Sequence, residues 1–344
     1  MDDGSNAPVR MALVGLGAIG LAAHLPALLR SDAAQLVGLV DPRSERRALA
    51  RKATGSDVPA YAHIDDLGGP ADVAGIVLAT PPWVTTDLAA RFLSAGHDVL
   101  AEKPVATSVA AARGLADLPP TELARLQMGL TYRHDPALAR VRDWIRSGPL
   151  DGPLLIRAHI YDERLDPTDP SHADRIRETL AHGSPVFHEG AHVFDWLAYL
   201  LDLPPERVAD AWAVRTDPAL PAPNLTGARL AYPGGTTALL EFGWLTDGLP
   251  RCELSILGQR AHAELDGHTF RLRLTTATGV EVVDDPVDRT TRCFDRQLAA
   301  FVDLVSGRAD QAVPGFAEGI ASLELAELVA LQAATLPRGP REKP

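Results

Sequence analysis

Near its start the chain reads Val9-Arg-Met-Ala-Leu-Val-Gly-Leu-Gly-Ala-Ile-Gly20, a short apolar segment that passes directly into three closely spaced glycines. The apolar run from Val9 to Val14 has the length and composition of a buried strand. The mostly apolar residues from Ile19 to Arg30 predict a helix. The sequence therefore predicts a strand, a glycine-rich turn and a helix in direct succession.

The spacing of the three glycines indicates what this turn does. Gly15 allows a tight turn, Gly17 lets a pyrophosphate approach the backbone, and Gly20 lets helix and strand pack closely. Peptide N–H groups at the start of the helix, at Ala18 and Ile19, then meet the phosphates at the positive end of the helix dipole. The segment predicts a Rossmann domain that binds a dinucleotide.

The residue after the second predicted strand bears on the choice of dinucleotide. That strand, Gln35 to Val40, ends at Asp41, about 20 residues after the glycines, where a carboxylate accepts the ribose hydroxyls. A carboxylate there repels a 2′-phosphate, so we expect NAD as the cofactor. Arg43 follows two residues later, and NADP is the alternative if its side chain turns toward the ribose.

Two further strands end in residues that belong to the same site. The run from Asp72 to Thr80 ends in Thr80-Pro81-Pro82, and the strand from Asp98 to Ala101 leads into Glu102-Lys103-Pro104. Open α/β sheets bind their ligands outside the carboxyl ends of the strands. We therefore expect all of these residues at one edge of the sheet, beside the cofactor.

Lys103 is one of three lysines in a chain that otherwise takes its positive charge from arginine. An ammonium group is a compact point charge that can lose its proton, whereas a guanidinium cannot. This makes Lys103 the candidate catalytic residue of the first domain.

The character of the sequence changes after about Leu126. We expect residues 1–126 to form the Rossmann NAD-binding domain and residues 127–344 to form an α/β domain for substrate binding and oligomerisation, with a mostly antiparallel open sheet. Alternating apolar and polar residues predict its strands at 154–161, 208–214, 225–231, 236–244, 252–257, 261–265 and 270–275. Helices are expected at 84–95, 107–117, 136–147, 292–306 and 316–334.

Composition excludes several classes of protein. A net charge of −12 disfavours nucleic acid and anionic membranes as partners. The apolar stretch from Met11 to Leu29 resembles a signal or membrane segment, but its glycine spacing, His24 and the acidic residues before it argue against that reading. Cys252 and Cys293 are expected as free thiols of a cytoplasmic protein.

A second chemical cluster lies at Phe187-His-Glu-Gly-Ala-His-Val-Phe-Asp-Trp196. On a helix His188, His192 and Asp195 share one face, at i, i+4 and i+7. His188-Glu-x-x-His192 also matches the pattern of zinc hydrolases. No third metal ligand follows at the expected spacing, so we expect no metal there. Gly190 is costly inside a helix, and the close approach of a ligand is one reason for it.

The motifs taken together resemble one family over nearly the whole chain. They are Gly15 to Gly20, Asp41, Ala79-Thr-Pro-Pro82, Glu102-Lys-Pro104, Tyr132-Arg133 and Gly190-x-His192-x-x-Asp195. In this order they are similar to the Gfo/Idh/MocA family of NAD(P)-dependent sugar and cyclitol dehydrogenases, which pair a Rossmann domain with an α/β domain whose open sheet commonly mediates dimers or tetramers. The resemblance implies that His192 takes the proton of a substrate hydroxyl, that Lys103 stabilises its oxygen, and that hydride passes to nicotinamide.

Two residues depart from the family pattern. His188 stands where the family commonly has aspartate, so we expect His192 to remain the base and His188 to position substrate or relay a proton. The histidine often found after the Pro-Pro turn is absent, and Thr85 lies near that place.

A small polyhydroxylated substrate would be bound by Tyr132, Arg133, Tyr161, His188 and Asp195, with the polar segment 162–183 near the pocket. We expect a homodimer or homotetramer. Two other functions remain open, an NAD-dependent redox-elimination glycosidase and a non-catalytic NAD-dependent sensor.

Overall fold

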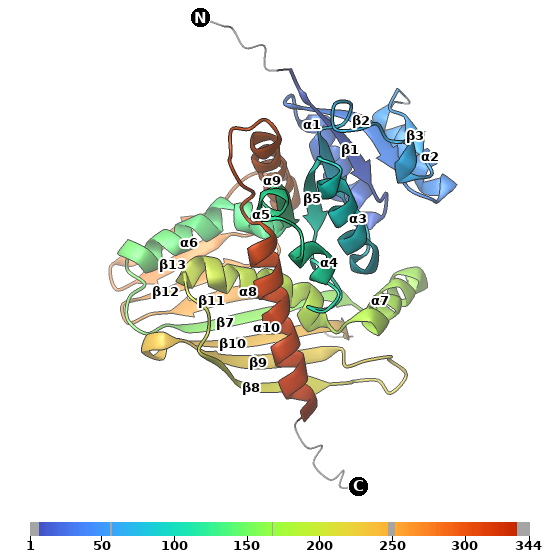
Figure 1. Ribbon diagram of the computed structural model, residues 1–344. Coiled ribbons are helices and arrows are strands. Elements are labelled where there is room, and N and C mark those ends of the chain that lie inside the picture. The colour runs from blue at the N-terminus through green and yellow to red at the C-terminus, as the bar shows by residue number, and fades with distance from the viewer. Residues whose placement is uncertain (1–6, 56, 167, 247–251, 336–344) are drawn as a thin grey trace, which may run out of the picture. The chain divides into compact units, whose positions relative to one another are not determined.

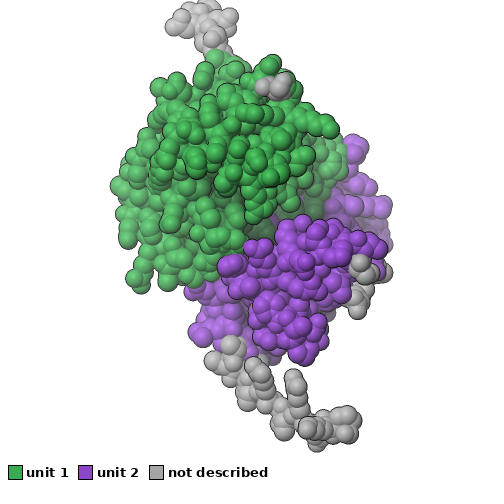
Figure 2. All heavy atoms as spheres, turned by 90° about the vertical axis from the view of Figure 1, so that its right-hand side faces the viewer, with its two compact units in different colours: residues 1–135, 287–323 green, residues 136–286, 324–344 purple. Residues whose placement is uncertain are grey.

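The computed structural model describes residues 7–55, 57–166, 168–246 and 252–335. The chain divides into two compact units, each built from two separate stretches of sequence (Figure 2). Unit 1 consists of Met1–Asp135 and Val287–Leu323, and unit 2 of Pro136–Pro286 and Glu324–Pro344. The division of the chain into functional domains at residue 126 stays a prediction.

Unit 1 contains a parallel sheet. Within its described residues six strands follow the order β3-β2-β1-β4-β5-β6, and every neighbouring pair is parallel. The strands are β1 (Val9–Val14), β2 (Ala34–Val40), β3 (Ala60–Tyr61), β4 (Gly75–Leu78), β5 (Asp98–Glu102) and β6 (Leu126–Gly129). The order reverses between β1 and β4, as in the doubly wound sheets that bind dinucleotides. The predicted Rossmann fold is confirmed.

The helices of unit 1 cover this sheet and complete its core. They are the π turn η1 (Gly20–His24), α1 (Leu25–Arg30), α2 (Ser44–Thr54), α3 (Pro82–Ser94), α4 (Arg113–Ala116), α5 (Pro120–Leu123), α9 (Arg289–Val305) and the 3-10 turns η2 (Ile64–Asp66) and η3 (Thr131–His134). Although α9 is distant in sequence, its Leu298 and Phe301 lie in one apolar cluster with Leu13 of β1. The core of unit 1 therefore depends on a helix from near the other end of the chain.

One predicted helix of this unit is shorter in the structure. The segment Thr107–Asp117 is helical over Arg113–Ala116. The Oγ atom of Ser108 accepts a hydrogen bond from the N–H of Ala111 at 3.0 Å. Serine side chains that bond to nearby backbone in this way favour turns over helix interiors.

Unit 2 contains a mostly antiparallel sheet, as expected. Within its described residues the strand order is β14-β13-β12-β11-β7-β10-β9-β8, in which β7 and β10 form the parallel pair. The strands are β7 (Leu155–Arg164), β8 (Arg207–Val214), β9 (Leu225–Ala231), β10 (Thr237–Thr246), β11 (Cys252–Leu257), β12 (Ala261–Asp266), β13 (Leu272–Thr276) and β14 (Gly279–Val283). The sequence analysis did not predict β14, whose residues are mostly exposed.

Helices cover one face of the sheet of unit 2 (Figure 1). The helical elements are α6 (Pro136–Ser147), α7 (Pro170–His182), α8 (Pro185–Leu201), the 3-10 turn η4 (Pro233–Gly235) and the part of α10 (Phe316–Thr335) that begins at Glu324. The ring of Phe194 in α8 lies 5.8 Å from that of Phe242 in β10. Because side chains alternate along a strand, the neighbours of Phe242 point to the opposite face. No helix in the described residues is long and apolar enough to cross a membrane.

Candidate functional site

The predicted cofactor residues of unit 1 lie at the carboxyl ends of four adjacent strands. They are Gly15 after β1, Asp41 after β2, Thr80 beyond β4 and Lys103 after β5. These strands are neighbours in the order β2-β1-β4-β5, and all run in the same direction. Because parallel strands end at one edge, the four groups share the edge where open α/β sheets bind ligands.

Steric constraints at the glycine turn explain two of its glycines. Gly15 has a φ of +94°, which side chains disfavour, and a Cβ atom there would lie 2.4 Å from the carbonyl oxygen of Ala79. A Cβ atom on Gly20 would lie 2.2 Å from the oxygen of Gly15. The turn is tied to the sheet by the N–H of Gly15, which donates to Val40 O at 2.8 Å. No larger residue fits at either position without a backbone shift.

We expect Gly15→Ala to lower the free energy of unfolding by more than about 2 kcal/mol, because left-handed strain of about 1–2 kcal/mol adds to the clash with Ala79. Chemical denaturation and an NADH titration would measure both consequences, and NADH binding should be lost. Gly55→Ala is the matched control, since Gly55 has a φ of +76° but no atom within 4 Å of a built Cβ. Wild-type NADH affinity in Gly15→Ala would contradict this account.

The remaining glycine of the turn, Gly17, leaves the backbone accessible. A Cβ atom on Gly17 would meet only the Nη1 atom of Arg46, at 3.6 Å, and Ala18 and Ile19 beyond it are exposed. Peptide N–H groups in the first turn of a helix have no partner within the helix. The turn therefore fits a pyrophosphate, which needs accessible N–H donors and no intervening side chain.

Asp41 is buried and held by the backbone. Its Oδ2 atom accepts the N–H of Leu16, and its Oδ1 atom accepts the N–H of Arg43, each at 2.9 Å. The Nη1 atom of Arg46 lies 3.5 Å from Oδ2. The sequence analysis named Arg43 as the cation at this place and missed Arg46, because Arg46 reaches the carboxylate from the first turn of α2, a helix it did not predict.

The Thr-Pro-Pro segment forms the start of α3. Pro81 precedes the helix and Pro82 opens it. The Oγ1 atoms of Thr80 and Thr85 lie 2.7 Å apart, and Thr85 also donates to the carbonyl oxygen of Pro81 at 3.0 Å. Thr85 is 1% exposed, and its hydrogen bonds connect α3 to the preceding turn.

Glu102 is the last residue of β5 and Lys103 follows it, and the two side chains have different surroundings. Lys103 is half-buried, whereas Glu102 is 8% exposed. One oxygen of Glu102 lies 2.7 Å from the Nε2 atom of His24, and the other accepts the N–H of Lys103 at 3.2 Å. Sequence reasoning did not single out His24 as a partner of this site.

The Tyr132-Arg133 motif lies in η3. The guanidinium of Arg289 stacks on the ring of Tyr132, 4.5 Å from its centroid, and Arg133 lies 3.4 Å from a carboxylate oxygen of Glu318. Burial, with help from the charge of Arg133, lowers the pKa of the neighbouring His134 to about 4. His134 is therefore uncharged at neutral pH.

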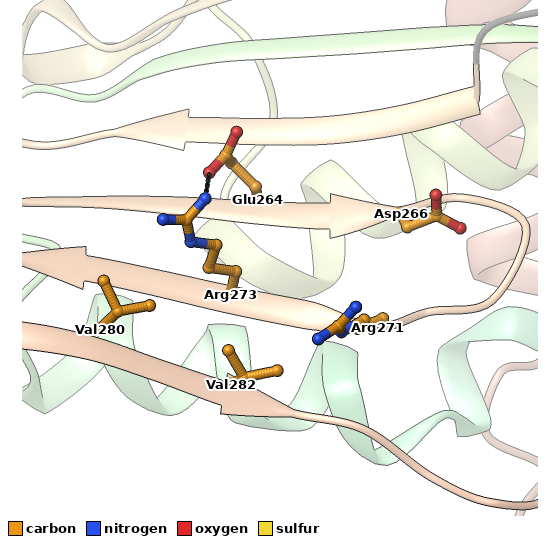
Figure 3. Close-up of a pocket in the computed structure, with 6 residues that line it drawn as sticks. All are labelled: Glu264, Asp266, Arg271, Arg273, Val280 and Val282. Atoms are coloured by element: carbon orange, nitrogen blue, oxygen red, sulfur yellow. Dashed lines mark ion pairs between the residues drawn. The ribbon is translucent and has the colours of Figure 1, made fainter.

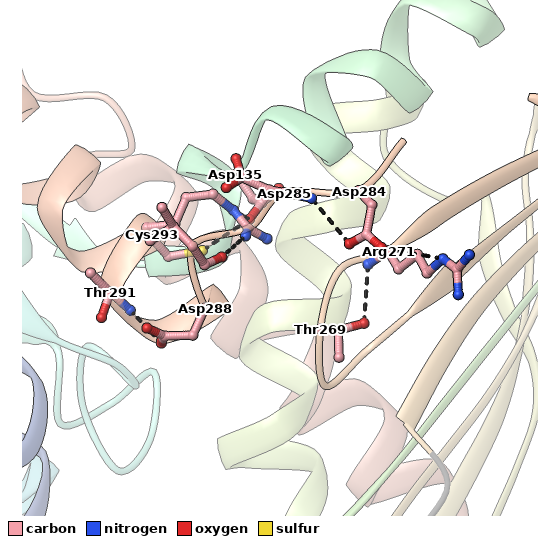
Figure 4. A network of polar contacts seen from close by, with 10 residues as sticks. Asp135, Thr269, Arg271, Asp284, Asp285, Asp288, Thr291 and Cys293 are labelled. Carbon is pink, nitrogen blue, oxygen red and sulfur yellow. Dashed lines mark hydrogen bonds and ion pairs between the residues drawn. The ribbon is translucent and has the colours of Figure 1, made fainter. Parts of the chain in front are cut away.

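A buried polar cluster follows η3 (Figure 4). Asp135 accepts from Nε of Arg292 at 2.7 Å and from the thiol of Cys293 at 3.3 Å, and Arg292 also donates to the carbonyl oxygen of Val287. Burial and the charge of Asp135 raise the pKa of Cys293, so the thiol stays protonated. No disulfide joins Cys293 and Cys252 in the described part of the chain.

The second predicted cluster lies on α8 in unit 2. His192 is 7% and Asp195 1% exposed, whereas His188, one turn earlier, is half-buried. The ring of His188 lies 5.1 Å from that of Trp244 in β10. The helix thus brings the three predicted side chains to one region of unit 2, as their spacing requires.

The structure gives Gly190 a different role from the one expected. A Cβ atom at this position would lie 2.8 Å from the ring of Phe194, one turn later on α8. Packing of this ring is a sufficient reason for the glycine. Among the described residues no group of three or more His, Cys, Asp or Glu side chains is placed to hold a metal ion.

Tyr161 is not brought together with the residues on α8. It pairs with Gly243 of β10, and its hydroxyl donates to Glu241 at 3.0 Å. Glu241 alternates with Phe242, which packs on α8, so Tyr161 lies on the opposite face of the sheet. Burial first, then the bond to Glu241, raises the pKa of Tyr161. Its role in substrate binding stays a prediction.

The polar segment 162–183 contains a helix. α7 begins after Asp169, whose side chain accepts the N–H of His172 at 3.0 Å. Its Ile176 and Leu180 pack in a small apolar cluster with Trp244. The segment is therefore anchored to the sheet of unit 2 near the strand that also contacts His188.

A shallow hollow lies on the uncovered face of the sheet, at β12, β13 and β14 (Figure 3). It is lined by Glu264, Asp266, Arg271, Arg273, Val280 and Val282. Arg273 lies 3.9 Å from Glu264. None of the predicted site residues lines it.

Comparison with known proteins identifies both parts of the chain. Residues 9–130 match the GFO_IDH_MocA oxidoreductase family with an NAD-binding Rossmann fold, and residues 138–264 match the GFO/IDH/MocA C-terminal domain. The chain therefore belongs to the Gfo/Idh/MocA family of oxidoreductases, and the predicted enzyme class and NAD cofactor are confirmed.

Individual relatives agree with this assignment. The chain is 30% identical to the rhizopine catabolism protein MocA of Rhizobium meliloti over 61% of its own length and 64% of that protein, just under two thirds. It is 28% identical to inositol 2-dehydrogenase 1 of Saccharopolyspora erythraea over 93% and 92% of the two chains. A solved levoglucosan dehydrogenase, in complex with NADH and levoglucosan, shares the fold with a TM-score of 0.78 at 18% identity, over 95% and 97% of the two chains.

Proposed function

We propose that the protein transfers a hydride between NAD and a secondary alcohol of a sugar, a cyclitol or a similar polyhydroxylated compound. The observation that supports this most directly is the arrangement in unit 1. The glycine turn with its open backbone, the carboxylate of Asp41 and Lys103 follow β1, β2 and β5, which run parallel in one sheet. Negative charge develops on the oxygen of a hydroxyl group as it is oxidised, and a cation beside the cofactor stabilises that charge.

The proposed mechanism assigns one task to each residue. Lys103 donates a hydrogen bond to the reacting oxygen and stabilises its developing negative charge. His192 takes the hydroxyl proton as general base. His188 positions substrate or relays this proton, and Asp195, Tyr132 and Arg133 bind other hydroxyls. Bound NAD supplies the carbon that accepts the hydride.

The relatives support the substrate class. The names of two relatives refer to inositol and to levoglucosan, and both compounds are polyhydroxylated. In this proposal residues 1–126 bind NAD and residues 127–344 bind the substrate and mediate assembly into a homodimer or homotetramer. A cytoplasmic location remains part of the proposal.

The test is a fluorescence titration with NADH and with NADPH, followed by a screen of inositols, hexoses and anhydrosugars with NAD. Tight NADH binding and net reduction of NAD by one of these compounds would support the proposal. Bound cofactor without net turnover, together with cleavage of a glycoside, would replace it by the redox-elimination mechanism. Binding of neither nucleotide would refute it.

Asp41 should determine the preference between the two nucleotides. We expect Asp41→Asn to weaken NADH binding by about 10-fold or more, since a hydrogen bond to a charged group contributes about 1.5–3 kcal/mol. NADPH should bind no more weakly than before, because the repulsion of its 2′-phosphate is removed while Arg46 remains. Parallel titrations measure both affinities, with the exposed Asp57→Asn as control. Equal losses for both nucleotides would mean that Asp41 only supports the turn.

A further inference from the structure

We propose that His24 and Glu102 form a positioning pair that fixes Lys103 for catalysis. This inference rests on the proposed function, in which Lys103 contacts the reacting oxygen. It concerns side chains from two segments that are 78 residues apart in sequence.

The carboxylate of Glu102 is held at both oxygens. Its Oε1 atom lies 2.7 Å from Nε2 of His24, and its Oε2 atom accepts the N–H of Lys103 at 3.2 Å. The side chain of Glu102 is 10% exposed and that of His24 is 5% exposed. When Glu102 is ionised it can only accept, so the bond requires a proton on Nε2 of His24. The backbone of Lys103 is thereby tied through one carboxylate to the helix after the glycine turn.

Three local features make room for this pair. His24 is the last residue of the π turn η1, and such turns are rare and often occur at functional sites. The ring of His24 meets Phe294 of α9 edge-on, at 4.9 Å. Glu102 pairs with Gly129 of β6, where a Cβ atom would lie 3.2 Å from the Cδ atom of Glu102. Sheet, helix and core all accommodate the same contact.

Burial of this pair removes two polar groups from water, which costs free energy, so stabilisation of the fold does not explain why the pair is present. Replacing a buried ionic or polar pair by apolar residues of similar size is often neutral or stabilising. Positioning gives it a purpose, since a displacement of about 1 Å at a reacting group can lower a rate by about 100-fold. The pair joins the turn proposed to bind the pyrophosphate to the residue proposed to stabilise the reacting oxygen.

The lysine content of the chain allows a test without a known substrate. Reductive methylation of the full-length protein with ¹³C-formaldehyde labels its three lysines and the N-terminal amine. Lys103→Met assigns the signal of Lys103 by its absence. NADH affinity, measured by fluorescence titration, reports separately on the glycine turn.

We expect His24→Leu to move the signal of Lys103 while that of Lys52 and the NADH affinity stay unchanged. His24→Gln places an amide donor near Nε2 and should return the signal toward its original position. With a polyol that the enzyme oxidises, His24→Leu should lower kcat by about 10- to 100-fold with little change in the KM for NAD. Glutamine has the size and shape of glutamate, so Glu102→Gln creates no cavity in the core. This variant should also move the signal of Lys103.

His97→Leu is the matched control. His97 is 4% exposed, its Nδ1 atom lies 2.7 Å from Val73 O, and its ring meets Phe92 edge-on, but it precedes β5 and so lies at the opposite end of that strand from Lys103. It should destabilise the fold without moving the signal of Lys103.

An unmoved signal in both His24→Leu and Glu102→Gln would overturn the inference. A moved signal with no polyol turnover in the wild type would uphold the pair and refute the proposed function.

Discussion

Replacement of Lys103 by methionine will lower turnover by about two to three orders of magnitude, the usual range for loss of a group that stabilises an oxyanion. Methionine has a similar length but no charge or hydrogen-bond donor, so the reacting oxygen loses its partner. NADH affinity should stay near that of the wild type, because the glycine turn and Asp41 follow other strands. Steady-state kinetics with an oxidised polyol and an NADH titration measure the two effects.

Lys52→Met is the control for this experiment. Lys52 lies exposed on α2 of the same unit, so its replacement removes the same charge far from any predicted site residue of β5. Lys103→Arg adds a second comparison, since guanidinium keeps the charge but differs in shape and does not deprotonate. Unchanged turnover in Lys103→Met would remove the proposed role of this residue.

The sequence correctly placed Gly15, Asp41 and Lys103 at one edge of the sheet of unit 1, because the signal for each of them is local. Gly15, Asp41 and Lys103 each follow directly after an apolar strand, and the rule that parallel strands end at one edge brings them together. No side-chain contact between distant segments was needed for that inference. The same locality predicted α6 and the strands of unit 2 with alternating burial.

Contacts between distant segments were not predictable in this way. The bond between His24 and Glu102 depends on a π turn and on the register of β5 with Gly129, neither of which leaves a periodic signal in the sequence. Arg46 was missed because α2 has few buried residues, with Ala50 as the buried position within it. Such a helix shows no apolar stripe.

Two expectations about unit 2 illustrate the limits of spacing alone. The sequence analysis gave the close approach of a ligand as one reason for Gly190, whereas the structure places the ring of Phe194 beside it. Tyr161 was grouped with the substrate residues by its chemistry, whereas its position in β7 directs it to the face opposite α8. Successive side chains of a strand point to opposite faces of the sheet. Residues grouped by their chemical type alone can therefore lie on different faces.

The roles of the two histidines on α8 give the last large prediction. We expect His192→Asn to lower turnover by about 100- to 1,000-fold, within the range for a general base, and His188→Ala to lower it by about 10-fold. His192 is buried on the same face of α8 as Asp195, whereas the ring of His188, one turn earlier, lies near that of Trp244. Added imidazole should partly restore activity to His192→Ala, because it replaces the missing base, and should do little for His188→Ala.

His262→Ala is the control, because His262 bonds to Ser255 on neighbouring β strands and lies outside both clusters. Its activity should match the wild type with and without imidazole. Activity retained in His192→Asn and lost in His188→Ala would reverse the two roles. Such a reversal would mean that His188 has taken over the proton transfer. The choice between the two assignments therefore depends on which variant imidazole restores.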